Sequence, residues 1–274
     1  MMAPSEAEVA RARAAVIEAG RIAMGHFRRP HESWHKGPGQ IVTEADLAVD
    51  RFLKAELCRA DEGWLSEETA DDRCRLTTRD VWIVDPIDGT RSFAEGVAEF
   101  TISAALVREG EPVLGLVLNP ATEELFEAVR GRGATRNGVP MRASRAASLD
   151  EAHIVASRFE SRRRNFAALI PTAALSGLGS LAYKLALVAA GRYDGYLSWR
   201  RTHDWDIAGA MVLLAEAGAV IGDAGGAPIR LNRPDPVHPG VLAAGAALFP
   251  RLLAATAGAN AAYRADRRAR GLPD

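Results

Sequence analysis

The sequence predicts a layered α/β fold, with helices packed on sheets in both halves of the chain. Segments with apolar residues at helical spacing alternate with short apolar runs typical of buried strands, from the N-terminus to the C-terminus. The chain has 274 residues, of which 48% are hydrophobic and 25% charged. This length is sufficient for one large domain or two closely packed ones.

The N-terminal half is predicted to begin with two helices. Ser5 and Glu8 match a capping box, and apolar residues at near-helical spacing predict a helix from about Glu6 to Phe27. The segment from Arg28 to Gln40 is rich in Pro, Gly, His and Lys, so we expect a loop there. Helical spacing returns from Thr43 to Arg59 and predicts the second helix.

Short apolar runs in the middle of the chain predict strands. They are expected around Trp64 and over Val81–Val84, Phe100–Val107 and Val113–Leu118. The polar segment Glu109 to Pro112 contains Gly and Pro, which is typical of a hairpin connection between the last two strands. Residues 130–141 are turn-rich, and the pair Asn137-Gly138 indicates a tight turn.

The C-terminal half again mixes strands and helices. The expected elements are a strand over His153–Ser157, a helix over Ser180–Ala190, a strand over Tyr193–Leu197 and helices over Asp204–Ala217 and about Ala246–Ala269. A boundary near residues 144–150 divides the chain into an N-terminal α+β half, residues 1–145, and a C-terminal α/β half, residues 146–274.

Composition narrows the class of function and the compartment. The net charge of -1 gives no global basic excess, so nucleic-acid binding is not expected. The N-terminal segment lacks the uninterrupted apolar core of a secretory signal, and no run approaches the about 18–20 apolar residues that span a bilayer. Cys58 and Cys74 show neither metal-site spacing nor a disulfide framework. We therefore expect a cytoplasmic protein without a membrane anchor.

The hexapeptide Asp85-Pro86-Ile87-Asp88-Gly89-Thr90 follows a predicted buried strand, where α/β proteins present side chains to ligands. One interpretation is a Pro-Gly turn with solvated carboxylates. A calcium loop is excluded because Ile87 stands where an oxygen ligand is needed. An aspartyl-phosphate phosphatase is excluded because Pro86 stands two residues before Asp88, where the nucleophile should be. A pair of aspartates three residues apart, able to bind metal, remains.

Three further acidic positions each have an ordinary structural explanation. The pair Glu67-Glu68 could lie on a surface loop, and Asp206 could stabilise the start of a helix. Asp46 stands three residues after Thr43, which matches a capping box. Each feature alone says little, but all of them occur in one chain.

Taken together, these segments resemble the signatures of the inositol monophosphatase superfamily. Residues 82–93, which read Trp-x-Val-Asp-Pro-Ile-Asp-Gly-Thr-x-x-Phe, resemble its central signature. Residues 66–68 and 43–46 resemble its Gly-Glu-Glu and Thr-x-x-Asp segments, and residues 205–209 with 216–218 resemble its C-terminal signature. The order and approximate spacing also match over nearly the whole chain. Ser66 replaces the usual Gly, and Ser92 stands where Asn is common, but neither change removes a metal ligand.

The resemblance implies an α-β-α-β-α sandwich and a phosphomonoesterase that uses two or three Mg²⁺ ions. The ligands implied for one ion are Glu67, Asp85 and the carbonyl of Ile87, those for a second are Asp85, Asp88 and Asp206, and Asp46 would help to hold a third through water.

The resemblance also implies how the substrate is handled. Glu67 and Thr90 would orient and deprotonate an attacking water, which the metal activates. The backbone N–H groups of Gly89 and Thr90 would hold the phosphate of a small phosphorylated metabolite. A homodimer and inhibition by lithium are further expectations from the family.

Substrate identity rests on fewer residues. The inositol phosphatases carry a glutamate a few residues before the C-terminal Trp-Asp, and Trp199 falls on or near that position. Trp199 with Arg200 and Arg201 would suit a nucleobase or a second phosphate, or the tryptophan packs at a domain edge and the arginines are solvated. Lys184, in Gly179-Ser180-x-x-x-Lys184, resembles the bacterial 3'(2'),5'-bisphosphate nucleotidase branch and would contact a second phosphate, or it is a surface lysine.

These residues favour adenosine 3',5'-bisphosphate as the substrate. Inositol phosphate, another sugar phosphate and histidinol phosphate are alternatives. A different class of function is a non-catalytic module that binds RNA or protein through the arginines at positions 264, 267, 268 and 270. Against that function, every implied type of metal ligand is present.

Overall fold

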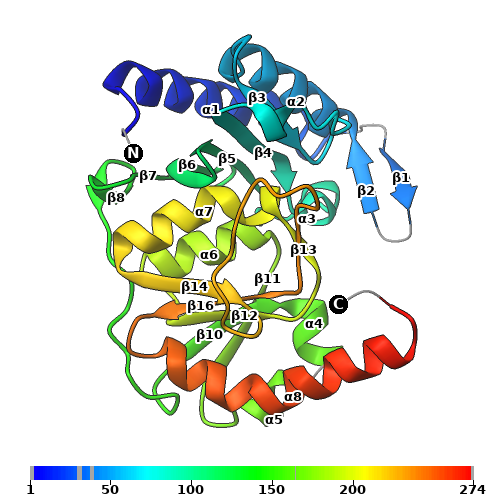
Figure 1. Ribbon diagram of the computed structural model, residues 1–274, viewed down its shortest axis with the longest axis vertical. Coiled ribbons are helices and arrows are strands. Elements are labelled where there is room, and N and C mark those ends of the chain that lie inside the picture. The colour runs from blue at the N-terminus through cyan, green and yellow to red at the C-terminus, as the bar shows by residue number, and fades with distance from the viewer. Residues whose placement is uncertain (1–2, 30–32, 38–39, 164, 273–274) are drawn as a thin grey trace.

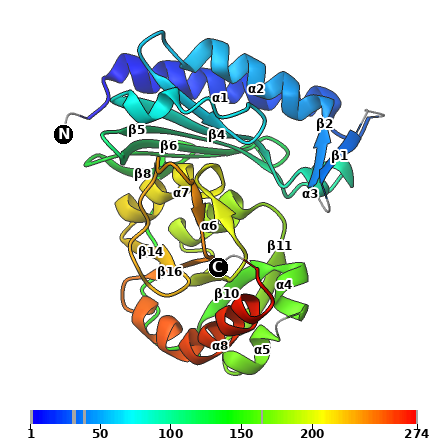
Figure 2. The same cartoon turned by 45° about the vertical axis from the view of Figure 1, so that its right-hand side comes forward.

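The computed structural model describes residues 3–29, 33–37, 40–163 and 165–272. Within these residues the chain forms the predicted α-β-α-β-α sandwich (Figures 1 and 2). The outer helices on the first sheet are α1 (Glu6–His26) and α2 (Glu44–Leu57). The helices between the sheets are α6 (Leu181–Ala189) and α7 (Asp204–Ala217). The outer helices on the second sheet are α4 (Arg158–Arg163), α5 (Phe166–Leu169) and α8 (Phe249–Ala269).

The first sheet is formed by the N-terminal half and has seven strands among the described residues. In spatial order they are β3 (Gly63–Ser66), β4 (Asp80–Asp88), β5 (Thr101–Arg108), β6 (Glu111–Asn119), β7 (Glu124–Val129), β8 (Gly133–Arg136) and β9 (Val139–Pro140). β3 runs parallel to β4, and the other neighbours are antiparallel. Two short helices flank β4, η1 (Cys74–Thr77) before it and α3 (Thr90–Ala94) after it.

The second sheet is formed by the C-terminal half. Its described strands are, in spatial order, β11 (Ala174–Leu178), β10 (His153–Ser157), β12 (Gly195–Ser198), β16 (Val241–Gly245) and β14 (Ala219–Asp223). The first three run parallel, and β16 is antiparallel to both of its neighbours. Two small antiparallel ladders lie outside the sheets, β1 (Ser33–Gly37) with β2 (Gln40–Thr43) and β13 (Thr202–His203) with β15 (Val237–His238).

Helix starts follow the capping signals in the sequence. The Ser5 hydroxyl accepts a hydrogen bond from the Glu8 N–H at 3.2 Å, and Glu8 Oε2 accepts one from the Ser5 N–H at 2.8 Å. This confirms the capping box predicted for α1. Thr43 and Asp46 form the corresponding box at the start of α2. The pattern of polar residues therefore predicted both helix starts correctly.

Several sequence-based boundaries were wrong. The segment Arg28–Gln40 was expected to be a loop, but it contains β1 and leads into β2. Pairing between these two strands supplies backbone hydrogen bonds despite the polar composition. Residues 30–32 and 38–39 of this segment lie outside the described residues. The strand expected to end at Val84 continues to Asp88. Strands β7, β11, β14 and β16 were not predicted at all, and α8 begins at Phe249 rather than at Ala246.

The two halves share a core. Buried side chains of α6 and α7 pack in one cluster with residues of the first sheet and of the second, including Val117, Leu185, Leu213 and Val241. The predicted boundary at residues 145/146 lies in a segment between β9 and β10 that has no helix or strand. We keep it as a proposed division of the chain, with the central helices as the layer that joins the two parts.

A close backbone contact seats α7 on the first sheet. A Cβ atom at Gly115 of β6 would lie 2.1 Å from the carbonyl oxygen of Gly209 in α7. A Cβ atom at Gly209 would lie 2.6 Å from Ser103 Oγ and 3.0 Å from the carbonyl oxygen of Leu116. Only glycine leaves room for this approach, which brings the first turn of α7 to the end of β4.

Within the described residues, no helix has both the length and the apolar composition needed to span a membrane.

We predict that Gly209→Ala destabilises the protein by about 1–3 kcal/mol, because the added methyl group overlaps backbone that cannot move aside cheaply. Urea denaturation measures this change in the free energy of unfolding. Gly258→Ala is the matched control, since Gly258 also lies in a helix but has nothing within 4 Å of its added Cβ. The control should gain up to about 1 kcal/mol from helix propensity. Equal effects of the two substitutions would contradict the role of this contact.

Candidate metal centre

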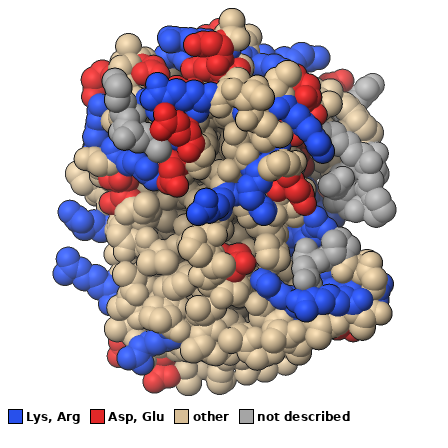
Figure 3. Space-filling view, in the orientation of Figure 1, with Lys and Arg blue, Asp and Glu red and all other residues tan. Residues whose placement is uncertain are grey.

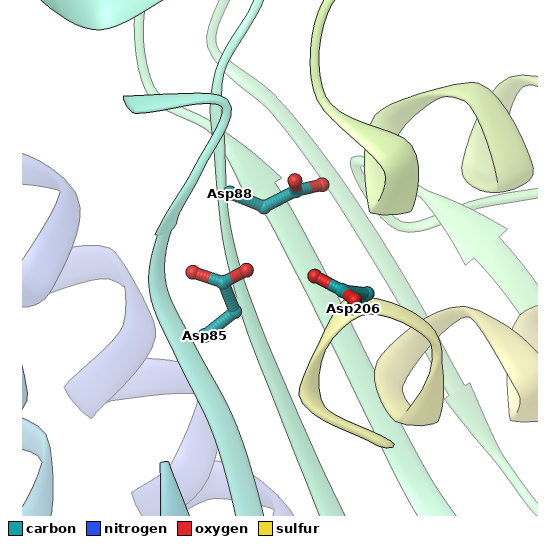
Figure 4. Close-up of side chains that lie close together, drawn as sticks. All are labelled: Asp85, Asp88 and Asp206. Atoms are coloured by element: carbon teal, nitrogen blue, oxygen red, sulfur yellow. The ribbon is translucent and has the colours of Figure 1, made fainter. Parts of the chain in front are cut away.

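Three aspartates meet between β4 and α7. One carboxylate oxygen from each of Asp85, Asp88 and Asp206 lies within 4.8 Å of the other two. Asp85 and Asp88 belong to the N-terminal half and Asp206 to the C-terminal half, and Figure 4 shows the three carboxylates gathered in the space between the strand and the helix. Asp85 and Asp88 are buried, and Asp206 is partly exposed.

A β-bulge turns Asp85 and Asp88 to the same side of the sheet. Residues three apart in a regular strand point to opposite faces. On the partner strand β5, however, Asp85 pairs with Ser103 and Asp88 with Thr101, which are only two residues apart. The register therefore shifts by one residue between the two aspartates. Pro86 is tolerated in this stretch because a bulge leaves a residue out of the ladder.

The start of α7 fixes Asp206. Its Oδ2 atom accepts a hydrogen bond from the His203 N–H at 2.6 Å, which closes a capping box. The ordinary explanation of Asp206 as a residue that stabilises a helix start is thus correct. The same residue also contributes an oxygen to the acidic cluster, so the structural and the functional interpretation do not exclude each other.

Asp88 joins the two halves through the start of α6. Its Oδ2 atom accepts hydrogen bonds from Ser180 Oγ at 2.6 Å and from the Ala182 N–H at 2.5 Å. Ser180 is the N-cap of α6, and its hydroxyl also accepts a hydrogen bond from the Tyr183 N–H at 3.0 Å. The sequence analysis named Ser180 as part of the motif that contains Lys184 but gave it no role of its own. Its position at a helix start is visible in the sequence, but its contact with Asp88 depends on the tertiary fold.

Glu67 follows β3 and is close enough for its charge to interact with Asp206, Asp88 and Asp46. Asp50, buried in α2, accepts hydrogen bonds from Ser66 Oγ and Thr69 Oγ1, both at 2.5 Å. These two residues flank Glu67 and Glu68, so Asp50 holds both ends of the acidic segment. Sequence reasoning missed Asp50, although it lies one helical turn after Asp46.

Asp46 and Thr90 are also in contact. Asp46 Oδ2 accepts hydrogen bonds from the N–H and the hydroxyl of Thr43, at 2.8 and 2.6 Å. The Thr90 hydroxyl is placed to donate to Asp46 Oδ1, at 3.3 Å, or to the carbonyl oxygen of Ile87, at 3.0 Å. The structure thus brings Asp46, Ile87 and Thr90 together beside the acidic cluster, as the resemblance implied.

Gly89 allows the chain to turn from β4 into α3. Its φ of 95° lies in the left-handed region, and a Cβ atom would lie 2.8 Å from the carbonyl oxygen of Glu99. The absence of a side chain keeps the backbone of Gly89 and Thr90 next to Asp88 and the start of α6.

Burial and mutual repulsion raise the pKa values of the cluster. Burial, followed by repulsion from Asp206, Glu68, Asp88 and Asp46, raises the pKa of Glu67 to about 8. Burial and the neighbouring carboxylates raise the pKa of Asp85 well above its usual range. Burial raises the pKa of Asp46 to about 6 and, together with Asp206, raises that of Asp88. These carboxyl groups therefore retain protons that ordinary carboxyl groups release.

The donor set fits a hard divalent cation. Both carboxylate oxygens of Asp85 are buried and have no hydrogen-bond partner among the described residues, which is costly for a charged group. The surrounding ligand atoms are carboxylate oxygens without nitrogen or sulfur, the set that Mg²⁺ prefers over softer metals. A cation at Asp85 would satisfy these oxygens and remove the repulsion that raises the pKa values.

The residues expected to bind the remainder of a substrate are engaged in other contacts, although the charge of Lys184 also interacts with Asp88. Lys184 is buried, with only 4% of its surface exposed, and its Nζ atom donates hydrogen bonds to the carbonyl oxygens of Gly179, at 2.7 Å, and Leu178, at 3.3 Å. It is therefore not the surface lysine that was one of the two expectations. Burial lowers its pKa to about 8. Arg201 is partly exposed in the segment that leads into β13.

Trp199 is 5% exposed and packs in a hydrophobic cluster of the second sheet. Its ring lies against Phe166 and Tyr263, with centroid distances of 5.1 and 5.8 Å. The structure places this ring in a hydrophobic cluster rather than at the acidic cluster. Of the two interpretations from the sequence, a binding role and packing, this position favours packing. The sequence could not distinguish the two because a tryptophan suits a core and a binding surface equally well.

Comparisons with known proteins identify the family of this chain. The model of the inositol monophosphatase family matches residues 5–262. An inositol-1-monophosphatase of Rhizobium meliloti is 38% identical over 208 residues, which cover 71% of this chain and 77% of the relative. A fructose-1,6-bisphosphatase/inositol-1-monophosphatase of Thermotoga maritima is 35% identical, with 76% and 81% covered. The crystal structure of the suppressor protein SuhB of Bartonella henselae superimposes with a TM-score of 0.81 at 28% identity, over 91% and 98% of the two chains.

We predict that the metal-free protein loses stability as the pH rises from about 5 to 8. The pKa of Glu67 rises from its ordinary 4.5 to about 8 on folding, so the folded chain holds a proton that the unfolded chain has released. This contribution is complete below the unfolded pKa and is lost as the pH passes the folded one. Melting curves with EDTA and with Mg²⁺ should therefore diverge increasingly over this range, and a constant gap would contradict the prediction.

We predict that Asp85→Asn stabilises the metal-free protein at pH 8, by about 1–3 kcal/mol. The substitution removes a buried carboxyl group that must either be ionised without a partner or hold a proton that the unfolded chain releases at this pH. Urea denaturation in EDTA measures the change. Asp61→Asn is the control, since Asp61 is exposed and its substitution should change stability by less than about 0.5 kcal/mol. A loss of stability in Asp85→Asn would show that the carboxylate is stabilised by the protein itself.

Proposed function

Because this chain belongs to the inositol monophosphatase family, a class of metal-dependent phosphatases, we propose that it uses Mg²⁺ to hydrolyse the phosphate monoester of a small polyol. The observation that carries this proposal is the buried carboxylate of Asp85, whose two oxygens have no partner among the described residues and one of which lies within 4.8 Å of an oxygen of Asp88 and of Asp206. Glu67, Asp85, Asp88, Asp206 and the carbonyl of Ile87 are the proposed ligands.

Bound Mg²⁺ would neutralise phosphate oxygens, acidify a water and stabilise the leaving alkoxide. The residues of the chain hold the reactants. The Thr90 hydroxyl has a single proton, which Asp46 Oδ1 or the Ile87 carbonyl accepts. Its lone pairs are then left to accept a hydrogen bond from a water, which would orient the oxygen of that water away from Thr90 and toward the substrate. Glu67, whose charge interacts with Asp46, Asp88 and Asp206, is the proposed base.

Asp88 and the start of α6 keep the site dry and rigid. Two hydrogen bonds from the start of α6 engage one oxygen of Asp88 and leave the other for a ligand. The Lys184 ammonium, bound to the carbonyls of Leu178 and Gly179, holds the turn that precedes α6. We propose that Lys184 is a positioning residue for this turn rather than a direct contact to the substrate.

The proposed substrate class follows from what surrounds the cluster. The ring of Trp199 and the ammonium of Lys184, which favoured a nucleotide in the sequence, are engaged in the interior. Relatives of 38% and 35% identity bear the name of inositol-1-monophosphatase. Both facts support a polyol phosphate such as myo-inositol 1-phosphate as the first choice.

A 3'(2'),5'-bisphosphate nucleotide is the second candidate. Arg200 is exposed and Arg201 partly exposed, and both precede the start of α7 that carries Asp206. Guanidinium groups at such positions suit a second phosphate. The nucleotide therefore remains a proposal with two residues in its favour, and histidinol phosphate has no residue that favours it.

A non-catalytic RNA- or protein-binding module is not favoured. Arg264 lies 3.9 Å from Asp223, Arg267 donates to the hydroxyl of Tyr263, and Arg270 lies 3.6 Å from Asp266. On the face shown in Figure 3, blue atoms run together at the lower right, where Figure 1 has the end of α8, and elsewhere lysines and arginines alternate with acidic and uncharged residues. The homodimer and the lithium inhibition stay predictions from the resemblance, and the cytoplasmic location stays a prediction from composition.

We predict Mg²⁺-dependent phosphate release from myo-inositol 1-phosphate, with a lower rate on adenosine 3',5'-bisphosphate and none in EDTA. Asp88→Asn should lower kcat/KM at least about a hundredfold, or about 2.7 kcal/mol, because one ligand charge is lost. Asp61→Asn should leave it unchanged. Preference for the nucleotide would overturn the substrate class but not the metal chemistry. Equal rates with Mg²⁺ and with EDTA would overturn both.

A further inference from the structure

A chain of hydrogen bonds outside the acidic cluster connects the segment of Glu67 with the start of α7. It begins at Arg75 of η1, which is completely buried. The guanidinium of Arg75 pairs with both carboxylate oxygens of Asp71, at 3.1 and 2.8 Å. Asp71 lies four residues after Glu67. A fully buried arginine is rare unless its guanidinium group is paired and hydrogen-bonded.

The backbone of Arg75 is seated against β3. A Cβ atom at Gly63, the first residue of β3, would lie 2.7 Å from the Cα atom of Arg75. The two segments are therefore in direct backbone contact. Glu67 follows the last residue of β3, so the position of Arg75 is coupled to that of Glu67 within the N-terminal half.

Asn232 continues the chain into the C-terminal half. Its Oδ1 atom accepts a hydrogen bond from Arg75 Nη1 at 2.6 Å, and its Nδ2 atom donates to the carbonyl oxygen of Arg75 at 3.3 Å. Its own backbone N–H donates to Asp204 Oδ2 at 2.7 Å. Asn232 thus uses three groups to bridge two segments that are far apart in the sequence.

Asp204 ends the chain at the first residue of α7, two residues before Asp206. Its side chain is fully buried, and its other oxygen, Oδ1, lies 2.6 Å from His238 Nε2. The Asp204 N–H donates to the carbonyl oxygen of Pro236 at 2.9 Å. The segment 231–238, with β15 paired to β13, therefore lies along the start of α7. Figure 1 shows this orange segment rising from the second sheet toward the N-terminal half.

We infer that segment 231–238 is a strap that sets the spacing between Glu67 and Asp206, with Asn232 as its positioning residue. This inference rests on the proposed metal-dependent function. Glu67 and Asp206 come from different halves, and their like charges repel when no cation separates them. The strap opposes this repulsion through hydrogen bonds of Arg75, Asn232 and Asp204, none of which involves the side chain of a proposed metal ligand. The strap would keep Glu67 and Asp206 close enough for both to bind the Mg²⁺ ions of the same site.

Asn232→Gly tests the strap. The φ of Asn232 is 57°, so glycine accepts the backbone conformation without strain, and the N–H to Asp204 remains. Only the two side-chain bonds to Arg75 are lost. Isothermal titration of the substrate-free protein with Mg²⁺ should show affinity weaker by about tenfold, the range for partners that orient ligands. At saturating Mg²⁺, kcat should stay within about twofold of the wild-type value, because no reacting group has changed.

Asn137→Gly is the matched control. Asn137 also has a left-handed φ, of 50°, and its side chain also makes two hydrogen bonds, to the Leu125 N–H and the Glu123 carbonyl. It lies in a surface turn of the first sheet, away from the strap. Its substitution should lower the melting temperature without changing Mg²⁺ affinity. Asn232→Asp, which keeps the acceptor for Arg75, should retain most of the affinity.

Hydrogen exchange provides a second readout. Amides of residues 66–72 and 202–207 should exchange faster in Asn232→Gly than in the wild type or in Asn137→Gly. Unchanged Mg²⁺ affinity in Asn232→Gly, or an equal loss in Asn137→Gly, would overturn the strap and leave the proposed function intact. Absence of Mg²⁺ binding by the wild-type protein would overturn the proposed function and the strap together.

Discussion

The carboxylates of Asp85, Asp88, Asp206 and Glu67 converge where most water is excluded, so each raises the electrostatic energy of the others. Protons or a cation must offset this repulsion. Protons do so at low pH in the metal-free chain, as the raised pKa of Glu67 indicates. At neutral pH a divalent cation does so better, because it also provides ligation for the two oxygens of Asp85. The stored repulsion is thus the origin of metal affinity.

Helix starts hold these charges in place. Asp46 and Asp206 are the third residues of α2 and α7, where they close capping boxes, and Asp88 accepts hydrogen bonds at the start of α6. Backbone N–H groups and the helix dipole stabilise a carboxylate at such positions. The fold therefore offsets part of the repulsion with hydrogen bonds that also fix direction. Asp85 is the exception, since it lies in a strand and its two oxygens have no hydrogen-bond partner among the described residues, so that a bound cation would have to stabilise its charge.

Residues of the catalytic segments were predictable because their chemistry is local. The turn of Asp85 to Thr90, the acidic pair at Glu67 and the capping signals of both N-terminal helices appear in the sequence as short patterns. Residues whose role is to contact distant segments were not. Asp50 resembles any polar residue of an amphipathic helix, and Asn232 resembles any loop asparagine. Trp199 showed the reverse error, since a local pattern suggested a binding role for a ring that packs in a core.

The sequence by itself determined the layered fold, the longer helices, some of the strands, the family and the identity of the proposed metal ligands, because each is encoded in residue types at short spacing. Only the tertiary structure decided which of these residues meet. The bulge in β4 turns Asp85 and Asp88 to one face, and the glycine contact between β6 and α7 brings Asp206 beside them. The bulge depends on the pairing of β4 with β5, and the glycine contact depends on the packing of segments about a hundred residues apart. No local pattern carries information about either.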